Sequence, residues 1–297
     1  MQTVKFNTPL QDKKYFNNVK KLLDSKKSLH GPGENIFKIK KELKKQFGFE
    51  HVHLTNSCTA SMEICALMLD LKKNDEVLMP SYNYNTTASS FVRTGCKIRY
   101  CDIKKENLLP SFNDFKKNVN KNTKVIIVIH MQGLGVDYLD KLKNFCKRKK
   151  IFLIEDDCHS IRVGKLNKKP VSDVIFYSLK KIIKLAYSGG VLEINQKIYE
   201  NRPINIKLKK YQINPFDKFN NFLEINFLSL KRKLKYLFLK IPNYSKFNAI
   251  KNEKVKQDFL IDDYSNKIIR EENLKKIKRE RLKNYDLWKK FCSKNKS

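Results

Sequence analysis

The sequence lacks the closely spaced cysteine and histidine pairs that build zinc sites and dithiol redox centres. Its seven cysteines are scattered along the chain, and no C-x-x-C pair occurs among them. This spacing argues against a zinc finger and favours reduced thiols packed as small apolar groups. We therefore expect no metal ion and no structural disulfide.

Long hydrophobic runs are also missing. No stretch approaches the roughly 18 uninterrupted apolar residues typical of a membrane-spanning helix. The opening segment, "MQTVKFNTPLQDKKYF", lacks the apolar block of a secretory signal. We therefore expect a cytoplasmic protein without a membrane span. With 297 residues, 41% of them hydrophobic, the chain can bury a sizeable core.

Acidic residues are scarce, with 30 Asp and Glu against 63 Lys and Arg, which gives a formal net charge of +33. Such a charge is typical of proteins that bind nucleic acid or anionic membranes. Here, however, the lysines are spread over the whole chain, and aromatic residues do not interleave with the basic runs as a base-stacking surface requires. The distribution favours solvated lysine faces, with nucleic-acid binding as the alternative.

Glycine is absent from the 107 residues that follow Gly190. Tight turns that need a positive φ are therefore scarce there, and we expect helices and extended connectors. The last 32 residues form the pattern of one long amphipathic helix with a buried apolar stripe. The predicted stripe consists of Ile269, Leu274, Ile277, Leu282, Tyr285 and Trp288.

Between His51 and Asn195, short β-rich runs alternate with helical segments, which predicts an α/β domain with a largely parallel sheet. The predicted strands are 51–54, 76–82, 97–103, 124–130, 151–157, 173–179 and 190–195. The predicted helices are 59–71, 86–94, 112–118 and 138–149. We expect two regions: an N-terminal segment with the α/β domain over 1–195, and a helical region over 196–297.

Candidate binding residues follow several of these strands, where doubly wound sheets collect their ligands. Ser57 and Thr59 lie in a hydroxyl-rich turn before a helix, which suits a phosphate group but also suits simple helix capping. Tyr82 and Tyr84 follow the next strand. Their rings are candidates to cover an aromatic ligand, although aromatic residues in such places more often serve core or dimer contacts.

A run of carboxylates, Glu155 to Asp157, ends the fifth predicted strand, and His159 follows it. A buried carboxylate is costly unless it has a cation or several donors as partners. The alternative is a loop of solvated acids, and the residues alone leave both open. After the sixth strand come Lys180, Lys181 and Lys184; a nucleophilic amine needs a partly desolvated strand end, which favours Lys181 over Lys184.

Six stretches resemble, in order, the motifs of the DegT/DnrJ/StrS family of pyridoxal-phosphate-dependent sugar aminotransferases. They are "GPGENIFKIKKELKKQFG", "TNSCTASM", "VLMPSYNYNTTAS", "VIIVIHMQGLGVDYLDKL", "LIEDDCHSI" and "YSLKKIIKLAYSGGVL". The resemblance covers roughly residues 30–195. It implies the aspartate-aminotransferase fold, a three-layer αβα domain with a seven-stranded, mainly parallel sheet and pyridoxal 5'-phosphate as cofactor.

The resemblance also implies a role for each matching position. Lys181, three residues after Ser178 and eight before Gly189, matches the catalytic lysine that bonds to the cofactor. Asp156 matches the residue that pairs with the protonated pyridine nitrogen and holds it positive. His159 matches the residue near the cofactor's phenolic oxygen.

The remaining matching positions are those that, in the family, contact the face of the cofactor's pyridine ring and its phosphate group. Tyr84 matches the aromatic residue that stacks on the pyridine ring. Cys58 and Thr59 match positions that offer the phosphate their backbone N–H groups and the Thr59 hydroxyl, and Ser178 is a further phosphate candidate.

The implied activity is transfer of an amino group from an amino acid, glutamate in the first instance, to a keto-sugar carried by a nucleotide, in a homodimer. Three features depart from the family pattern. Asp157 replaces a small residue, and the loop "KKIIKLAYSGG" lacks the glycine and proline that commonly shape it in relatives. The chain also stops just after the helix that begins the family's C-terminal domain. We therefore expect a truncated member. The alternatives are an inactive cofactor-binding homologue and a basic nucleic-acid-binding protein, while Lys181 argues against the related sugar dehydratases, which carry histidine there.

Overall fold

The computed structural model describes the parts of the chain from which the fold and the site are built. These are residues 40–41, 43–44, 51–160, 171–183, 188–202, 209–210, 259–261, 265, 268–269 and 274–294. The predicted α/β domain is covered almost throughout. Most of the predicted second region, 196–297, lies outside the described residues.

The described strands form one sheet in the order β3-β2-β4-β5-β6-β7-β1-β9-β8. Their bounds are β1 His51–Thr55, β2 Glu76–Pro80, β3 Lys97–Cys101, β4 Thr123–Ile129, β5 Phe152–Asp157, β6 Val174–Ser178, β7 Gly190–Ile194, β8 Lys209–Lys210 and β9 Phe259–Leu260. Strand β7 is antiparallel to both β6 and β1, and the other neighbours from β3 to β6 are parallel. The predicted seven-stranded, mainly parallel sheet is confirmed.

Two short strands, β8 and β9, extend the sheet beyond β1. The sequence predicted only helices and connectors in that region, so the prediction missed them. Each strand has two residues, which is too short to produce the alternating apolar pattern by which strands are recognised.

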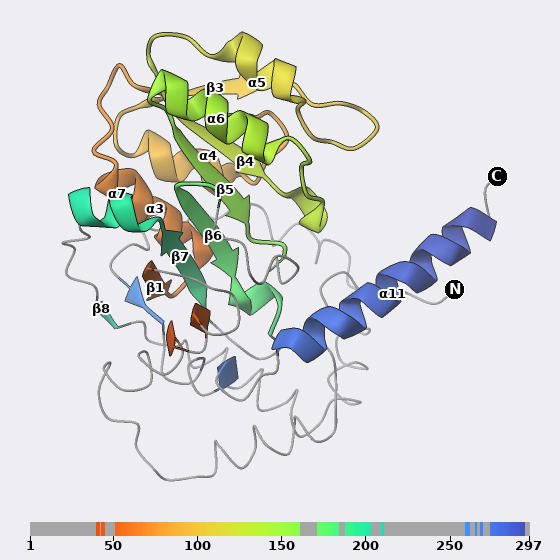
Figure 1. Cartoon of the computed structure of the whole chain (residues 1–297). Helices are drawn as coiled ribbons and strands as arrows, with labels where there is room; N and C mark the ends of the chain where they lie inside the picture. The colour runs from red at the N-terminus through yellow and green to blue at the C-terminus, as the bar shows by residue number, and fades with distance from the viewer. Residues whose placement is uncertain are drawn as a thin grey trace, which may run out of the picture.

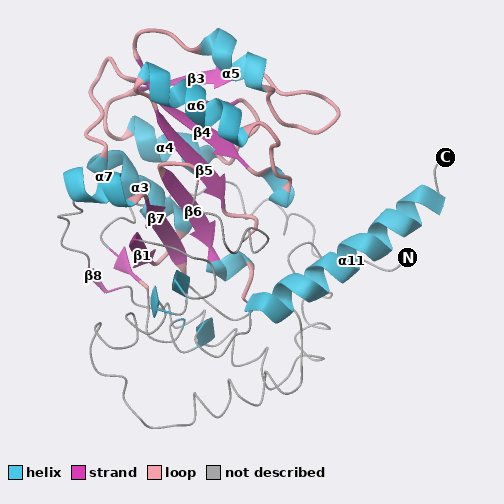
Figure 2. Ribbon diagram, in the orientation of Figure 1, coloured by secondary structure: helices cyan, strands magenta, loops and turns pink. Residues whose placement is uncertain are grey.

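Helices cover both faces of the sheet (Figures 1 and 2). Helices α3 (Cys58–Met68) and α4 (Asn85–Val92) lie on one face, and α5 (Phe112–Asn118) and α6 (Leu139–Lys149) lie on the other. The short helix α7 (Gln196–Asn201) follows β7. The predicted αβα layering is confirmed.

Strand β4 shows why the sheet needs helices on both sides. Alternate side chains of a strand point to opposite faces. Val125, Ile127 and Ile129 accordingly join the core beneath α3 and α4, while Ile126 and Val128 join the core beneath α5 and α6. All five are buried, so apolar side chains from both helical layers exclude water from this strand.

The last helix, α11 (Leu274–Lys294), extends away from the sheet (Figure 1). Ile269 and Ile277 of the predicted apolar stripe are buried, but Leu282 is 51% and Tyr285 is 59% exposed. The predicted stripe is therefore wrong for Leu282 and Tyr285, because only the first turns of α11 meet the α/β domain. The side chains of Leu274 and Trp288 lie outside the described residues. Among the described helices, none combines the length and apolar character needed to cross a bilayer.

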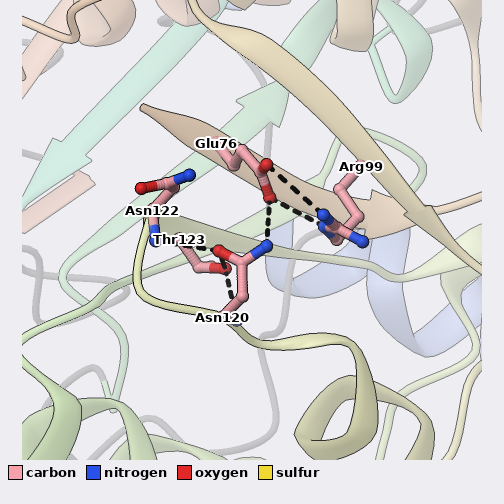
Figure 3. Close-up of polar contacts among 5 residues, drawn as sticks. All are labelled: Glu76, Arg99, Asn120, Asn122 and Thr123. Carbon is pink, nitrogen blue, oxygen red and sulfur yellow. Dashed lines mark hydrogen bonds and ion pairs between the residues drawn. The ribbon is translucent and has the colours of Figure 1, made fainter. Parts of the chain in front are cut away.

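A polar cluster joins the starts of β2 and β4 to the middle of β3 (Figure 3). Nε of Arg99 donates to Oε2 of Glu76 over 2.7 Å, and Nδ2 of Asn120 donates to the same oxygen over 2.9 Å. The backbone N–H of Glu76 donates to the carbonyl of Asn122. The hydrogen bond from Arg99, followed by that from Asn120, holds the pKa of Glu76 below its ordinary value.

The Glu76 cluster yields a pH-dependent stability prediction. Because the folded-state pKa of Glu76 is lowered, its contribution is present above the unfolded-state pKa and is lost as the pH falls through the folded-state pKa. We expect Glu76→Gln to lower the free energy of unfolding by about 1–3 kcal/mol at neutral pH. The gap from wild type should narrow in acid, as measured by urea unfolding at several pH values. The exposed residue Glu106 supplies the control, Glu106→Gln; equal losses in both variants would contradict this account.

Candidate active site

The candidate residues gather at one edge of the sheet, where β1, β5 and β6 end and β7 begins. In the strand register, Gly190 of β7 lies between Thr55 of β1 and Ser178 of β6. On the next strand, β5, Asp156 pairs with Phe176 of β6. Residues that lie far apart in the sequence therefore share one site at this edge.

The turn between β1 and α3 is held by local hydrogen bonds. The Thr55 hydroxyl donates to the carbonyl of Ser57 over 2.8 Å, and the Ser57 hydroxyl accepts from the N–H of Ala60 as the helix cap. The backbone N–H groups of Cys58 and Thr59 donate to no acceptor among the described residues. The sequence left helix capping and anion binding open, and the two are compatible. Ser57 caps the helix, and the free N–H groups of Cys58 and Thr59 form the positive end of its dipole, where an anion can bind.

All three carboxylates at the end of β5 are buried. Glu155 lies 2.8 Å from Nε2 of His130 and accepts a hydrogen bond from the Ser172 hydroxyl over 2.6 Å. Asp157 accepts a hydrogen bond from the Ser160 hydroxyl. The alternative of a solvated acidic loop is therefore wrong, and the departure at Asp157 is accommodated by a hydrogen-bond donor.

Asp156 has its own donors on the opposite face of β5. The Thr87 hydroxyl donates to Oδ2 over 3.1 Å, and the backbone N–H of Cys158 donates to Oδ1 over 3.2 Å. Burial raises the pKa of Asp156, and these two donors, together with the charge of Lys181, act against that rise. Sequence reasoning missed Thr87; its signal was a hydroxyl one helical turn after Tyr84, on the inward side of a helix that begins beside the site.

Lys181 interacts electrostatically with Asp156 and with His159. Burial lowers the pKa of the Lys181 amine, and the Asp156 carboxylate acts in the opposite direction. Burial also lowers the pKa of His159, with a further lowering from Lys181. Lys180, by contrast, is exposed, and Lys184 lies outside the described residues. The structure thus brings three of the predicted site residues together around one partly desolvated amine.

Ser178 and Tyr84 occupy different settings at this edge. Ser178 is buried at the end of β6, and its hydroxyl has no hydrogen-bond partner in the described part of the chain. Tyr84 precedes α4 and is 59% exposed. Its exposed ring gives no further evidence on ligand contact, and its stacking role stays a prediction.

The cysteine prediction is wrong for one pair. Cys58 and Cys158 form a disulfide across 100 residues of sequence, joining the start of α3 to the segment after β5. Spacing rules detect only local pairs, whereas here the sheet order brings two distant elements together. Both sulfur atoms lie within 4.8 Å of an Asp156 oxygen, and because they are bonded to each other they offer no thiolate to a metal. Four other cysteines are buried and free, as predicted: Cys65, Cys96, Cys101 and Cys146.

Gly190 allows the β1–α3 turn to pack directly against β7. A methyl group on Gly190 would lie 2.2 Å from the carbonyl oxygen of Ser57 and 2.3 Å from the Thr55 hydroxyl. The adjacent Gly189 donates its N–H to Asn56 over 3.0 Å and accepts from Leu179 over 2.7 Å. The glycine pair therefore ties the candidate phosphate turn to the lysine segment.

Comparison with known proteins places this site within a described family. The family model of the DegT/DnrJ/EryC1/StrS aminotransferases matches residues 9–201. The chain is 25% identical over 180 residues to GDP-perosamine synthase of Vibrio cholerae, covering 59% of this chain and 48% of that protein. It is 27% identical over 179 residues to GDP-4-keto-6-deoxy-D-mannose 3-dehydratase of Yersinia pseudotuberculosis, covering 57% of this chain and 44% of that protein. The chain thus spans about half the length of these curated relatives.

The fold is shared with solved structures. The structure of NtdA from Bacillus subtilis with bound cofactor PMP superposes with a TM-score of 0.56 at 20% identity. The match covers 87% of this chain and 65% of NtdA. This agreement in fold supports the three-layer architecture derived above.

The close approach at Gly190 yields a stability prediction. We expect Gly190→Ala to lower the free energy of unfolding by about 3 kcal/mol, because the methyl group meets backbone that cannot move without breaking the turn. The control is Gly95→Ala, where a methyl group meets no atom within 4 Å and only the positive φ of +89° is unfavourable, a cost of about 1 kcal/mol. Urea unfolding of both variants measures the difference, and a Gly190→Ala loss no larger than the control would refute the packing argument.

Proposed function

The chain belongs to the DegT/DnrJ/EryC1/StrS aminotransferase family, and from that premise we propose that it is a pyridoxal-phosphate-dependent sugar aminotransferase. The observation that carries the proposal is the half-buried Lys181 amine beside the buried Asp156 carboxylate. An amine with a lowered pKa is neutral in a larger fraction of molecules at neutral pH, as a nucleophile or a base requires. The relative named as a dehydratase belongs to a class that carries histidine at this position, so Lys181 favours the aminotransferase.

The donor set fits pyridoxal phosphate. The free N–H groups of Cys58 and Thr59 and the open Ser178 hydroxyl suit a phosphate dianion at a helix start. Asp156 is a buried carboxylate whose compensation is only partial, as its raised pKa indicates, and a protonated ring nitrogen would supply the missing positive charge. We assign the cofactor's phosphate to the N–H groups of Cys58 and Thr59 and the Ser178 hydroxyl, and its ring nitrogen to Asp156.

Each remaining residue has a role that follows from its environment. When bound, the cofactor supplies an electron sink that lets a proton leave the α-carbon of an amino acid. Lys181 would hold the cofactor through Nζ, and its free amine would take that proton from the α-carbon and return it. Thr87 and the N–H of Cys158 hold the Asp156 carboxylate in place. His159 lies near Lys181 and is assigned to the cofactor's phenolic oxygen, and Tyr84 to its ring face.

The substrate assignments are proposals drawn from the family and its relatives. Glutamate is the proposed donor, and a nucleotide-linked keto-sugar is the proposed acceptor. Support for the acceptor comes from the two relatives, whose names refer to GDP-linked sugars. We further propose a cytoplasmic homodimer, as the resemblance to the family implies.

The central test compares two adjacent lysines. Purified protein is mixed with pyridoxal phosphate, and visible absorbance is recorded before and after glutamate is added. We expect wild type and Lys180→Ala to develop the absorption of a lysine-bonded cofactor and to change it with glutamate, because the exposed Lys180 takes no part. Lys181→Ala should not develop it, and its transamination rate should fall by at least about 10²-fold.

The other outcomes separate the alternatives. A lysine-bonded cofactor that glutamate leaves unchanged identifies an inactive cofactor-binding homologue. Absence of cofactor binding in wild type sinks the proposal, and salt-dependent retention on DNA would then favour the nucleic-acid alternative.

A further inference from the structure

Three described residues far along the chain, Ser265, Ile269 and Arg281, contact the two described parts of the lysine segment. These parts, residues 179–183 and 188–190, are called the lysine loop below. At the far end, the backbone N–H of Ser188 donates to the Ser265 hydroxyl over 2.9 Å. A methyl group placed on Gly189 would lie 3.2 Å from Cδ1 of Ile269, so Ile269 packs closely against that glycine. Both Ser265 and Ile269 are buried, and the far end of the loop is therefore fixed against these two residues.

At the near end, the contact is made by Arg281 from the second turn of α11. Nη2 of Arg281 donates to the backbone carbonyl of Lys181 over 3.2 Å. Figure 1 shows the first turns of α11 beside the segment that follows β6. Lys181 is the last residue of the 3-10 helix η2 (Leu179–Lys181). A carbonyl at the end of a helix accepts no hydrogen bond from within that helix. A guanidinium group from another element satisfies it.

The setting of Arg281 distinguishes it from the other cations on α11. Its side chain is half-buried, and burial lowers its pKa, whereas Arg279 and Lys283 have largely exposed side chains that lie near Glu280. Arg281 has no ion-pair partner among the described residues. Partly desolvating a cation is costly, and the hydrogen bond to Lys181 is the only compensation the described contacts offer.

We infer that Arg281 is a positioning residue for Lys181: its guanidinium fixes the backbone of the lysine loop so that the Lys181 amine stays beside Asp156 and away from water. The role of this contact in catalysis rests on the proposed function, whereas the contact itself does not. Residues beyond the α/β domain thereby take part in forming the site, because the loop is held at one end by Ser265 and Ile269 and at the other by Arg281.

Hydrogen exchange of the protein without cofactor tests the contact directly. The amides of Ile182 and Ile183 both donate to the Leu179 carbonyl, over 2.9 and 2.7 Å, and they report whether the loop opens. We expect Arg281→Ala to speed their exchange by roughly three- to tenfold, the range for loss of one hydrogen bond, while the amides of β4 stay unchanged. The matched control is Arg279→Ala, which removes an arginine two residues away on the same helix and should leave both regions as in wild type.

A second readout is the pKa of the Lys181 amine, measured by competitive acylation of the cofactor-free protein across a pH series. Burial lowers this pKa, so a loosened loop should let it rise toward the ordinary lysine value in Arg281→Ala. Arg281→Lys retains a cationic donor and should recover most of the wild-type pKa and exchange. The inference is supported if the pKa of Lys181 rises in Arg281→Ala alone and amide exchange in β4 stays at its wild-type rate. A general loss of stability would speed exchange in β4 as well.

Three results would overturn the inference. In the first, Arg281→Ala leaves both the exchange of Ile182 and Ile183 and the pKa of Lys181 at their wild-type values. In the second, Arg279→Ala changes them as much as Arg281→Ala does, and in the third, Arg281→Ala speeds amide exchange in β4 as much as in the loop. If Arg281→Ala does not fold, Arg281→Met takes its place, because methionine retains an apolar side chain of similar length but cannot donate a hydrogen bond to the Lys181 carbonyl. Exchange at Ile182 and Ile183 must then exceed wild type in Arg281→Met for the inference to stand. Because none of these measurements needs cofactor or substrate, their failure is distinguishable from failure of the proposed function.

Discussion

The buried Asp156 carboxylate is the constraint around which the site is organised. A carboxylate in a low-dielectric environment is unfavourable unless donors or a cation compensate it. The fold supplies the Thr87 hydroxyl from α4, the Cys158 N–H from its own strand end and the charge of Lys181 from the segment after β6. Compensation remains partial, since the pKa of Asp156 is still raised. A ligand with a positively charged group next to Asp156 would complete the compensation of this carboxylate. The protonated ring nitrogen of the proposed cofactor would be such a group.

The parallel sheet makes this assembly possible. Strand ends that lie far apart in the sequence meet at one edge, so each element needs to contribute only one or two side chains. Gly190 permits the β1–α3 turn to approach β7, and its neighbour Gly189 joins that turn to the lysine loop. The candidate phosphate turn, the carboxylate and the amine are thus linked through backbone contacts as well as through their charges.

The sheet could be predicted from the sequence because its signals are local. Each of the seven main strands is a short apolar run between polar turns. The choice of Lys181 over Lys180 and Lys184 depends on its spacing to Ser178 and stays a prediction. The contacts that were missed are long-range: Thr87 meets Asp156 across 69 residues, and Cys58 meets Cys158 across 100. Amphipathic periodicity also indicates which face of a helix is apolar but not whether anything covers it, which is why Leu282 was wrongly placed in the core.

The central claim is that Asp156 and Lys181 interact across the site edge, and the pKa of the Lys181 amine tests it most directly. Competitive acylation of cofactor-free wild type and of Asp156→Asn measures that pKa in each. Burial lowers it and the Asp156 charge raises it, so removing the charge leaves only the lowering influence. The account predicts a lower Lys181 pKa in Asp156→Asn than in wild type. An unchanged or higher pKa in a folded variant would contradict it.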